Sequence, residues 1–256
     1  MLQGIKPSTS IKDVSKEVDY VVLSLPRTQD VEKVLNDDGV FAHGAPNTCI
    51  VDSSTISPIA SKEFAESAKK KNMKFLDTPM SGGIMGAQNG TLTFMVGAEN
   101  KEDYEHAAVV LRGMGKNIFH CGGPGTGEIA KIANNLILGI QMIAASEGMA
   151  LGEKLGIDPK VLMEILSVST SSCWAIKTAN PRPGNIETAP ASKNYEGGFQ
   201  VGLIRKDLAL AMEVADKCNA NIDFAKLSME YYRTLEKKGH GGKDFGYVFQ
   251  YIMKNH

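Results

Sequence analysis

Cysteine is scarce in this sequence, and the cysteines that occur are far apart. The chain of 256 residues has 4 of them, at Cys49, Cys121, Cys173 and Cys218, with no Cys-x-x-Cys pair and no Cys/His ligand spacing. A disulfide framework and a structural zinc site both need closely spaced ligands of this kind. We therefore expect no metal site, and reduced thiols in an intracellular compartment.

An excess of charge of one sign is also lacking. The formal net charge is -1, and the one dense basic run is the three lysines at residues 69–71. A nearly neutral chain has no field that attracts nucleic acid or an anionic membrane, so we expect neither as a partner. Residues 1–6 show no signal or transit pattern. The longest charge-free run, between Lys131 and Glu147, is too short to span a bilayer and is interpreted as a buried helix.

The first half of the sequence alternates short apolar runs with amphipathic stretches. The apolar runs are expected strands and lie at residues 20–25, 49–52, 73–77, 92–96 and 117–121. Expected helices between them lie at residues 30–35, 59–71 and 102–111. The first run, YVVLSL, is continuously apolar, which is typical of a parallel strand covered on both faces. This alternation predicts an α/β layer with a mostly parallel sheet.

The second half is helical in pattern. A long helical pattern covers residues 127–155, restarts at Asp158-Pro159, and is followed by shorter ones at residues 200–218, 224–238 and 245–254. We place a boundary in the glycine-rich run before residue 125, with an α/β domain at residues 1–124 and an all-α domain at residues 125–256. Residues 169–198 form a long irregular stretch, and such stretches are more often functional or disordered than idle.

The first segment that could carry chemistry is residues 77–83, DTPMSGG, directly after an expected strand. Ser81 supplies a hydroxyl, and Gly82 and Gly83 let a ligand approach backbone N–H groups closely, which suits a carboxylate or a phosphate. The carboxyl ends of parallel strands are where α/β proteins bind ligands. Glycine pairs also mark ordinary turns, so a flexible strand-to-loop turn is the competing interpretation.

The second segment is residues 125–135, GTGEIAKIANN. Lys131 and Asn135 stand four residues apart and therefore project from one helical face among apolar neighbours. In a partly desolvated pocket such a lysine becomes usable for proton transfer, and the asparagine can hold a substrate oxygen. The competing interpretation is a lysine that extends to the surface. The glycines of residues 122–127 match neither GxGxxG in its setting nor a P-loop, so we interpret them as a flexible link that starts the helix.

A third segment, residues 199–207 (FQVGLIRKD), places Lys206 after a largely apolar helix start, where it either contacts a ligand or lies on the surface. In this order the three segments resemble the 3-hydroxyacid dehydrogenase family. The patterns of that family are D-x-P-x-S-G-G, G-x-G-x-x-x-K-x-x-N-N and F-x-x-x-L-x-x-K-D. All three stand intact here, and the resemblance covers essentially the whole chain.

The resemblance implies a role for each matching residue. Lys131 matches the catalytic lysine, the general acid/base at the 3-hydroxyl of the substrate, and Asn135 matches the amide that orients the substrate. Ser81, Gly82 and Gly83 match the nest for the substrate carboxylate. The implied cofactor is NAD, and the residues that match its site are Leu25, Pro26, Asp30, Thr55 and Lys206. Asp30 stands where a relative carries an asparagine.

Three further segments resemble the 3-hydroxyisobutyrate branch of the family: residues 173–174, 180–184 and 194–199. Ser171-Ser172 departs from the Gly and Arg often found there. This branch implies oxidation of 3-hydroxyisobutyrate to methylmalonate semialdehyde, a step of valine breakdown, by a mitochondrial homo-oligomer. The alternatives are a sister reductase of a small semialdehyde or of glyoxylate, a non-catalytic form that associates with full-length subunits, and a Schiff-base enzyme built on Lys131.

The family pattern opens with a strand, a G-x-G-x-x-G turn, a helix and a second strand, whereas this sequence begins near the third strand. The resemblance therefore implies an incomplete Rossmann-like parallel sheet, a partial dinucleotide-binding domain, followed by an all-α domain for substrate and dimer contacts. We expect Val21, Val22 and Leu23 to lose neighbours and leave an open sheet edge. We also expect these 256 residues by themselves to be inactive, because the turn that binds pyrophosphate is missing.

Overall fold

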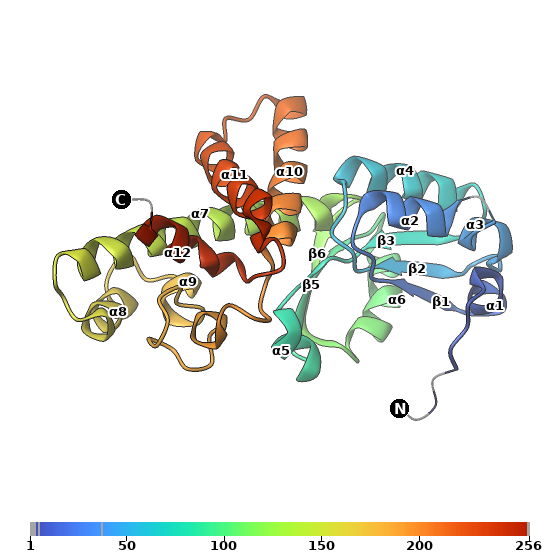
Figure 1. Cartoon of the computed structure of the whole chain (residues 1–256). Coiled ribbons are helices and arrows are strands. Elements are labelled where there is room, and N and C mark those ends of the chain that lie inside the picture. Colours follow the sequence, from blue (N-terminus) through green and yellow to red (C-terminus); the bar gives the residue numbers. More distant parts are fainter. Residues whose placement is uncertain (1–3, 5, 37, 255–256) are drawn as a thin grey trace. The chain divides into compact units, whose positions relative to one another are not determined.

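The computed structural model describes residues 4, 6–36 and 38–254 (Figure 1). By its internal contacts the chain divides into two compact units, Met1–Lys131 and Ile132–His256. This division by contacts falls inside one long helix, α7 (Thr126–Lys154), shortly after the boundary expected at residue 124. The reason is that backbone N–H groups at the start of this helix are bonded to a strand of the first unit.

The first unit is a six-stranded sheet with helices between its strands. Its strands are β1 (Tyr20–Leu23), β2 (Cys49–Asp52), β3 (Lys74–Asp77), β4 (Met80–Ser81), β5 (Leu92–Gly97) and β6 (Gly115–Gly122). Its helices are α1 (Ile11–Ser15), α2 (Thr28–Leu35), α3 (Val40–His43), α4 (Pro58–Lys69), α5 (Gly83–Gln88) and α6 (Lys101–Leu111). The expected strands and helices are confirmed. The elements that were not expected, β4, α1, α3 and α5, are too short for a periodic pattern to reveal them.

The sheet is mostly parallel, as expected, but it also contains antiparallel pairs. Its order is β1-β2-β3-β5-β4, with β6 beside β5. The first three strands are parallel and β6 is parallel to β5, but β5 runs antiparallel to β3 and β4. Parallel neighbours need a long crossover, usually a helix. The 11-residue α6 provides one between β5 and β6, whereas the short α5 turns the chain straight back into β5.

Both faces of the sheet are covered, so side chains that alternate along a strand enter two different cores. Ile50 and Phe75 pack in a cluster with residues of α2, α3 and α4, whereas Val51 and Leu76 pack in a cluster with residues of α6. Figure 1 shows α2 and α4 on one side of the strands and α6 on the other. This confirms the α/β layer that the alternation of strands and helices predicts.

Strand β1 lies at one edge of the sheet and, in the described part of the chain, pairs only with β2. The expectation that Val21, Val22 and Leu23 would all lose neighbours is correct for Val22 alone, which is 45% exposed. Val21 and Leu23 are buried because they point to the face that α2 and α4 cover. The edge of the sheet therefore exposes one face of β1.

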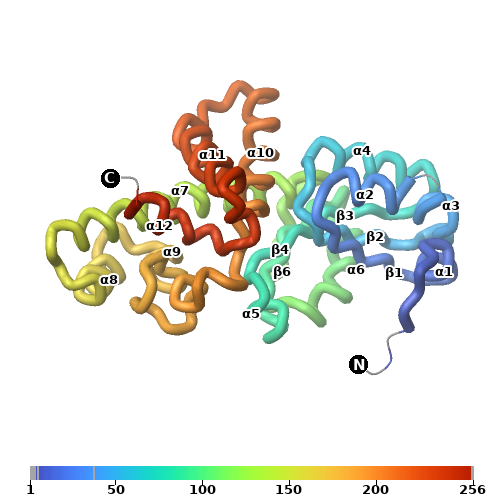
Figure 2. Tube along the Cα trace, viewed as in Figure 1, coloured from blue at the N-terminus to red at the C-terminus, as the bar shows by residue number. Residues whose placement is uncertain are grey.

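The second unit is helical. Its elements are the larger part of α7, then α8 (Pro159–Val168), α9 (Trp174–Lys177), η1 (Pro190–Lys193), α10 (Val201–Cys218), α11 (Asp223–Leu235), η2 (Glu236–His240), η3 (Phe245–Tyr247) and α12 (Val248–Lys254). The core contains Met142, Ile204, Leu208 and Tyr232. The Tyr232 hydroxyl donates to the carbonyl of Gly139 at 2.8 Å and so joins α11 to α7. Figure 2 traces α10 and α11 side by side, as their contacts require.

The irregular stretch at residues 169–198 is held in place by polar contacts. The Arg182 guanidinium donates to both carboxylate oxygens of Glu153 on α7, at 3.2 and 3.3 Å. Buried Asn180 accepts the backbone N–H of Arg182 at 3.1 Å. The Tyr195 hydroxyl donates to the carbonyl of Pro181 at 2.8 Å. These bonds add to the backbone hydrogen bonds of α9 and η1, the two short elements inside this stretch.

Helix α7 has a second property. It is long and apolar enough, by length and composition, to cross a membrane, although the charge-free run inside it is shorter. The core helix of a globular protein passes the same test. In the second unit Met142 and Met149 of α7 are fully buried against the other helices, as the interpretation of a buried helix requires.

Candidate active site

Three of the predicted site residues follow neighbouring parallel strands. In the register of the sheet Leu23, Asp52 and Asp77 stand in line, so β1, β2 and β3 end at one edge. Leu25, Thr55 and Ser81 lie in the segments that leave this edge. The carboxyl edge of parallel strands is the usual ligand site of such sheets. The structure thus brings these three segments to one place in the first unit.

Hydroxyl groups hold this edge together. The backbone N–H of Leu25 donates to Ser54 Oγ at 2.8 Å, and the hydroxyls of Ser53 and Thr78 are 3.1 Å apart. Partly buried Leu25, exposed Pro26 and partly buried Thr55 then present an apolar surface and one hydroxyl. That combination fits the flat ring of the predicted NAD, whose face is apolar and whose edge forms hydrogen bonds.

Asp30 lies in the first turn of α2 and is engaged by a neighbour. Arg27 donates to it from Nε at 2.9 Å and from Nη2 at 3.0 Å. The hydrogen bond from Arg27 lowers the pKa of the Asp30 carboxyl. The contact of Asp30 with the cofactor stays a prediction. In the structure this carboxylate is paired with Arg27.

The segment Ser81-Gly82-Gly83 is a strand-to-helix turn. Ser81 ends β4, Gly82 precedes α5 with φ +136°, and Gly83 begins it with φ +60°. Only glycine adopts such φ values readily. A Cβ on Gly82 would lie 3.0 Å from Leu92 Cδ2, so the backbone also needs glycine for space. The carboxylate nest at this turn stays a prediction, and the two positive φ values show that the turn needs glycine.

Lys131 projects from α7 near its start and is 8% exposed. The start of this helix is not the flexible link that we expected. Gly125 and Gly127 are buried, and a Cβ on Gly125 would lie 2.7 Å from the carbonyl oxygen of Pro58 in α4. A Cβ on Gly127 would collide with the carbonyl oxygen of Met95 in β5. The two glycines therefore allow the helix to touch the rest of the first unit.

Asp77 is a residue of the first pattern for which sequence reasoning assigned no role. Its carboxylate is fully buried and accepts the N–H of Gly125 at 2.7 Å and the N–H of Glu128 at 2.9 Å. Burial raises the pKa of Asp77, and the backbone hydrogen bonds oppose that shift. The signal for this role was present, since Asp77 ends a strand and is fixed in the family pattern, but its partners are distant in sequence.

In the second unit, Asp207 was missed in the same way. Asn135 is buried and donates from Nδ2 to Asp207 Oδ2 at 2.6 Å, and Asn135 Oδ1 accepts from Asn134 at 2.8 Å. Lys206 Nζ lies 3.1 Å from Asp207 Oδ1. The predicted substrate-binding Asn135 and the predicted cofactor-binding Lys206 therefore converge on one buried carboxylate.

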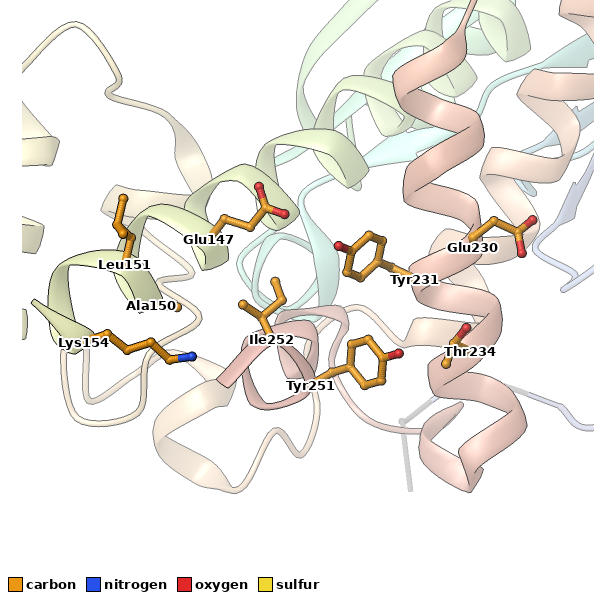
Figure 3. Close-up of a pocket in the computed structure, with 9 residues that line it drawn as sticks. All are labelled: Glu147, Ala150, Leu151, Lys154, Glu230, Tyr231, Thr234, Tyr251 and Ile252. Carbon is orange, nitrogen blue, oxygen red and sulfur yellow. The ribbon is translucent and has the colours of Figure 1, made fainter. Parts of the chain in front are cut away.

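A cavity of about 540 Å³ lies elsewhere in the second unit, between α7, α11 and α12 (Figure 3). Figure 3 shows Tyr231 and Tyr251 on one side of it and Glu147 and Lys154 of α7 on the other. None of the residues that line it is a predicted site residue. The described residues also hold no cluster of three His, Cys, Asp or Glu side chains that could bind a metal.

Two family models match the chain. Residues 1–123 match the NAD-binding domain of 6-phosphogluconate dehydrogenase. Residues 125–252 match the NAD-binding domain of NADP-dependent 3-hydroxyisobutyrate dehydrogenase. Together they cover both units of the chain.

Individual relatives agree with these models. The chain is 45% identical to a probable mitochondrial 3-hydroxyisobutyrate dehydrogenase of Dictyostelium discoideum, over 99% of this chain and 79% of the relative. It is 42% identical to an NAD-dependent L-serine dehydrogenase of Pseudomonas aeruginosa, over 96% of this chain and 82% of that protein. The Mycobacterium tuberculosis 3-hydroxyisobutyrate dehydrogenase with L-serine is a similar solved structure, with a TM-score of 0.89 and 35% identity over 96% of this chain and 83% of that one.

Proposed function

Because this chain belongs to the NAD-dependent 3-hydroxyacid dehydrogenase family, we propose that it oxidises 3-hydroxyisobutyrate to methylmalonate semialdehyde in valine breakdown. The observation that carries the proposal is buried Lys131 near the start of α7, in the same unit as the glycine turn after β4. NAD supplies the hydride acceptor when it is bound. The protein must then bind the hydroxyacid, orient it and accept the hydroxyl proton.

Each residue has one part in this proposal. The N–H groups and the hydroxyl of Ser81-Gly82-Gly83 bind the carboxylate, and Asn135 orients the substrate. The neutral amine of Lys131 takes the proton from the 3-hydroxyl as C3 loses hydride, which leaves an aldehyde and a lysine ammonium. Leu25, Pro26, Thr55 and Lys206 contact the cofactor.

L-Serine is the second candidate substrate, because two similar proteins are named for it or bound to it. Both candidates have a carboxylate and a hydroxymethyl group on C2. They differ only in the third group on C2, which is a methyl group in one and an ammonium group in the other. The nest and Lys131 would serve either molecule, so the choice lies with the residues around C2. The ratio of kcat/KM for the two substrates decides it.

The proposal extends to location and assembly. Relatives of this chain are named as mitochondrial proteins, which supports a mitochondrial location. The surface of α8 supports a homo-oligomer, because none of its residues, all of which are described, is buried. Ile165 of this helix is 48% exposed and Val168 is 88% exposed. Apolar patches of this kind commonly form subunit contacts.

Replacement of Lys131 tests the proposed function. We define the fused holoenzyme as a fusion protein with NAD bound, in which the opening segment of the Dictyostelium relative precedes this chain. This chain spans 79% of that relative. In it we expect Lys131→Ala to lower kcat by about 10²–10⁴-fold, the usual worth of general acid–base catalysis. Lys131→Arg fails as well, because guanidinium keeps its proton. The control is Lys154→Ala, which replaces an exposed lysine of the same helix and should keep full turnover. A Lys131→Ala enzyme that retained most of its kcat would show that the lysine is structural.

A further inference from the structure

Asp77 joins three elements of the first unit through one buried carboxylate. The residue ends β3, and its register partner in β5 is Gly97. Its two oxygens accept N–H groups of Gly125 and Glu128, which lie 48 and 51 residues away at the start of α7. A carboxylate at this place satisfies two of the N–H groups that a helix leaves unpaired at its start. It also faces the positive end of the helix dipole.

Space for the carboxylate comes from two glycines. A Cβ on Gly97 would collide with the Asp77 carboxylate, and the three nearest atoms that it would meet all belong to the Asp77 side chain. A Cβ on Gly127 would lie 2.9 Å from Asp77 Oδ2. A longer acid has no room in such a pocket, and a carboxamide has one acceptor oxygen for two N–H donors. The pocket thus specifies aspartate at this position.

Lys131 lies directly after the two residues, Gly125 and Glu128, that Asp77 binds. It lies three residues after Glu128, which is about 4.5 Å along the axis of an α-helix at its usual rise. The segment Thr78–Gly83, with the predicted carboxylate nest, leaves β3 directly after Asp77. One side chain therefore ties the helix that carries the lysine to the strand that leads into the nest.

We propose that Asp77 is a positioning residue for Lys131, whose buried carboxylate sets the place of the α7 start relative to the strand ends where the hydroxyacid binds. This inference rests on the proposed function of Lys131. Asp77 itself touches neither substrate nor cofactor in this scheme. Its effect is geometric, and a displacement of about 1 Å between reacting groups is enough to lower a rate roughly 10²-fold.

The first experiment compares two helix caps. Asp158 caps α8 by accepting the N–H groups of Lys160 and Val161 at 2.8 and 3.1 Å, and α8 carries no predicted site residue. We expect Asp77→Asn to increase hydrogen exchange at residues 125–131 of the chain and to lower kcat of the fused holoenzyme roughly 10- to 100-fold. The KM for NAD changes little. Asp158→Asn lowers the unfolding temperature and leaves kcat unchanged. An unchanged kcat in folded Asp77→Asn, or an equal loss in Asp158→Asn, overturns the inference.

The second experiment moves the carboxylate without removing its charge, and covers the case in which Asp77→Asn does not fold. Gly97→Ala displaces the Asp77 side chain and should lower kcat as Asp77→Asn does. Asp77→Ser/Gly97→Ala should be no slower than Asp77→Ser, because the shorter side chain makes room for the new methyl group. Additive losses would show that Gly97 acts independently of Asp77 and would contradict the inference. A Lys131→Ala enzyme with full turnover would contradict the proposed function. An inactive Lys131→Ala enzyme together with fully active Asp77 variants would contradict only this inference.

Discussion

Asn135 donates its side-chain amide to the buried carboxylate of Asp207, with 2.6 Å between Nδ2 and Oδ2. The other carboxylate oxygen lies 3.1 Å from the Lys206 ammonium. Asp207 therefore orients two residues that the family pattern assigns to different ligands. If Asn135 and Lys206 have the proposed roles, substrate and cofactor binding in the second unit depend on the same carboxylate.

Asp207→Asn should weaken the binding of both the hydroxyacid and NAD. A carboxamide has one acceptor oxygen, so either Asn135 or Lys206 faces an N–H₂ group where an oxygen was. We expect the free energy of unfolding to fall by about 1–3 kcal/mol, and the KM values for NAD and hydroxyacid both to rise. Asp216→Asn, an exposed position on the same helix, is the control. Lower stability with both KM values unchanged would assign Asp207 a structural role alone.

Alanine at the glycine turn should separate substrate binding from cofactor binding. Gly82→Ala forces a side chain into φ +136° and against Leu92, so we expect a strong rise in KM for the hydroxyacid and little change in KM for NAD. Gly83→Ala meets no described atom within 4 Å and should act more mildly. Gly90→Ala is matched to it, with φ +61° and similar open space outside the nest. Equal effects on the KM of the hydroxyacid in Gly83→Ala and Gly90→Ala would contradict the nest.

Asp244 should give stability an unusual pH dependence. Asp244 is buried. Its carboxylate accepts the N–H groups of Phe199 and Gly246, both at 2.9 Å. Desolvation raises the pKa of Asp244 from 3.8 to about 6. The folded protein therefore binds the proton more tightly than the unfolded protein. The stability that this group contributes is full below about pH 4 and is lost as the pH rises to about 6.

Denaturant unfolding at several pH values measures this contribution. Between pH 4 and pH 7 the free energy of unfolding of the wild type should fall by up to about 3 kcal/mol relative to that of Asp244→Asn, because the asparagine side chain does not titrate. Other carboxyl groups cancel in that difference. Asp216→Asn, which replaces an exposed aspartate, is the control. A difference of the opposite sign would mean that the two N–H bonds outweigh desolvation and that the pKa of Asp244 is lowered.

The exposed face of α8 should hold subunits together. Ile165→Glu places a charge at its centre, and a charge is costly to bury in an apolar contact, so we expect dissociation to a smaller species. Light scattering behind size exclusion measures the mass. Val109→Glu is the control, because Val109 is an exposed apolar residue on α6 of the first unit, where we propose no contact. A wild-type chain that is monomeric, or an Ile165→Glu chain of unchanged mass, would contradict the proposed contact.

Local pattern is enough to place most of the elements of this protein. The period of apolar residues identifies strands and helices because it specifies which face of an element avoids water, and that face depends on neighbours in sequence. Asp158-Pro159 marks the start of α8 for the same reason, since a cap and a first-turn proline act on the nearest backbone. Candidate site residues could be named as well, because Lys131 and Asn135 lie one turn apart on a helix and Ser81-Gly82-Gly83 are consecutive.

Packing over long distances decided the rest. The direction of β5 depends on where α5 returns the chain, and no period within β5 contains that information. Asp77 and Asp207 can be read in the sequence, but their partners lie 48, 51 and 72 residues away. A buried carboxylate must find donors wherever the fold brings them, because water is excluded and leaving the charge unpaired is costly. Glycines 97, 125 and 127 likewise have a purpose only when helix α7 lies against the sheet.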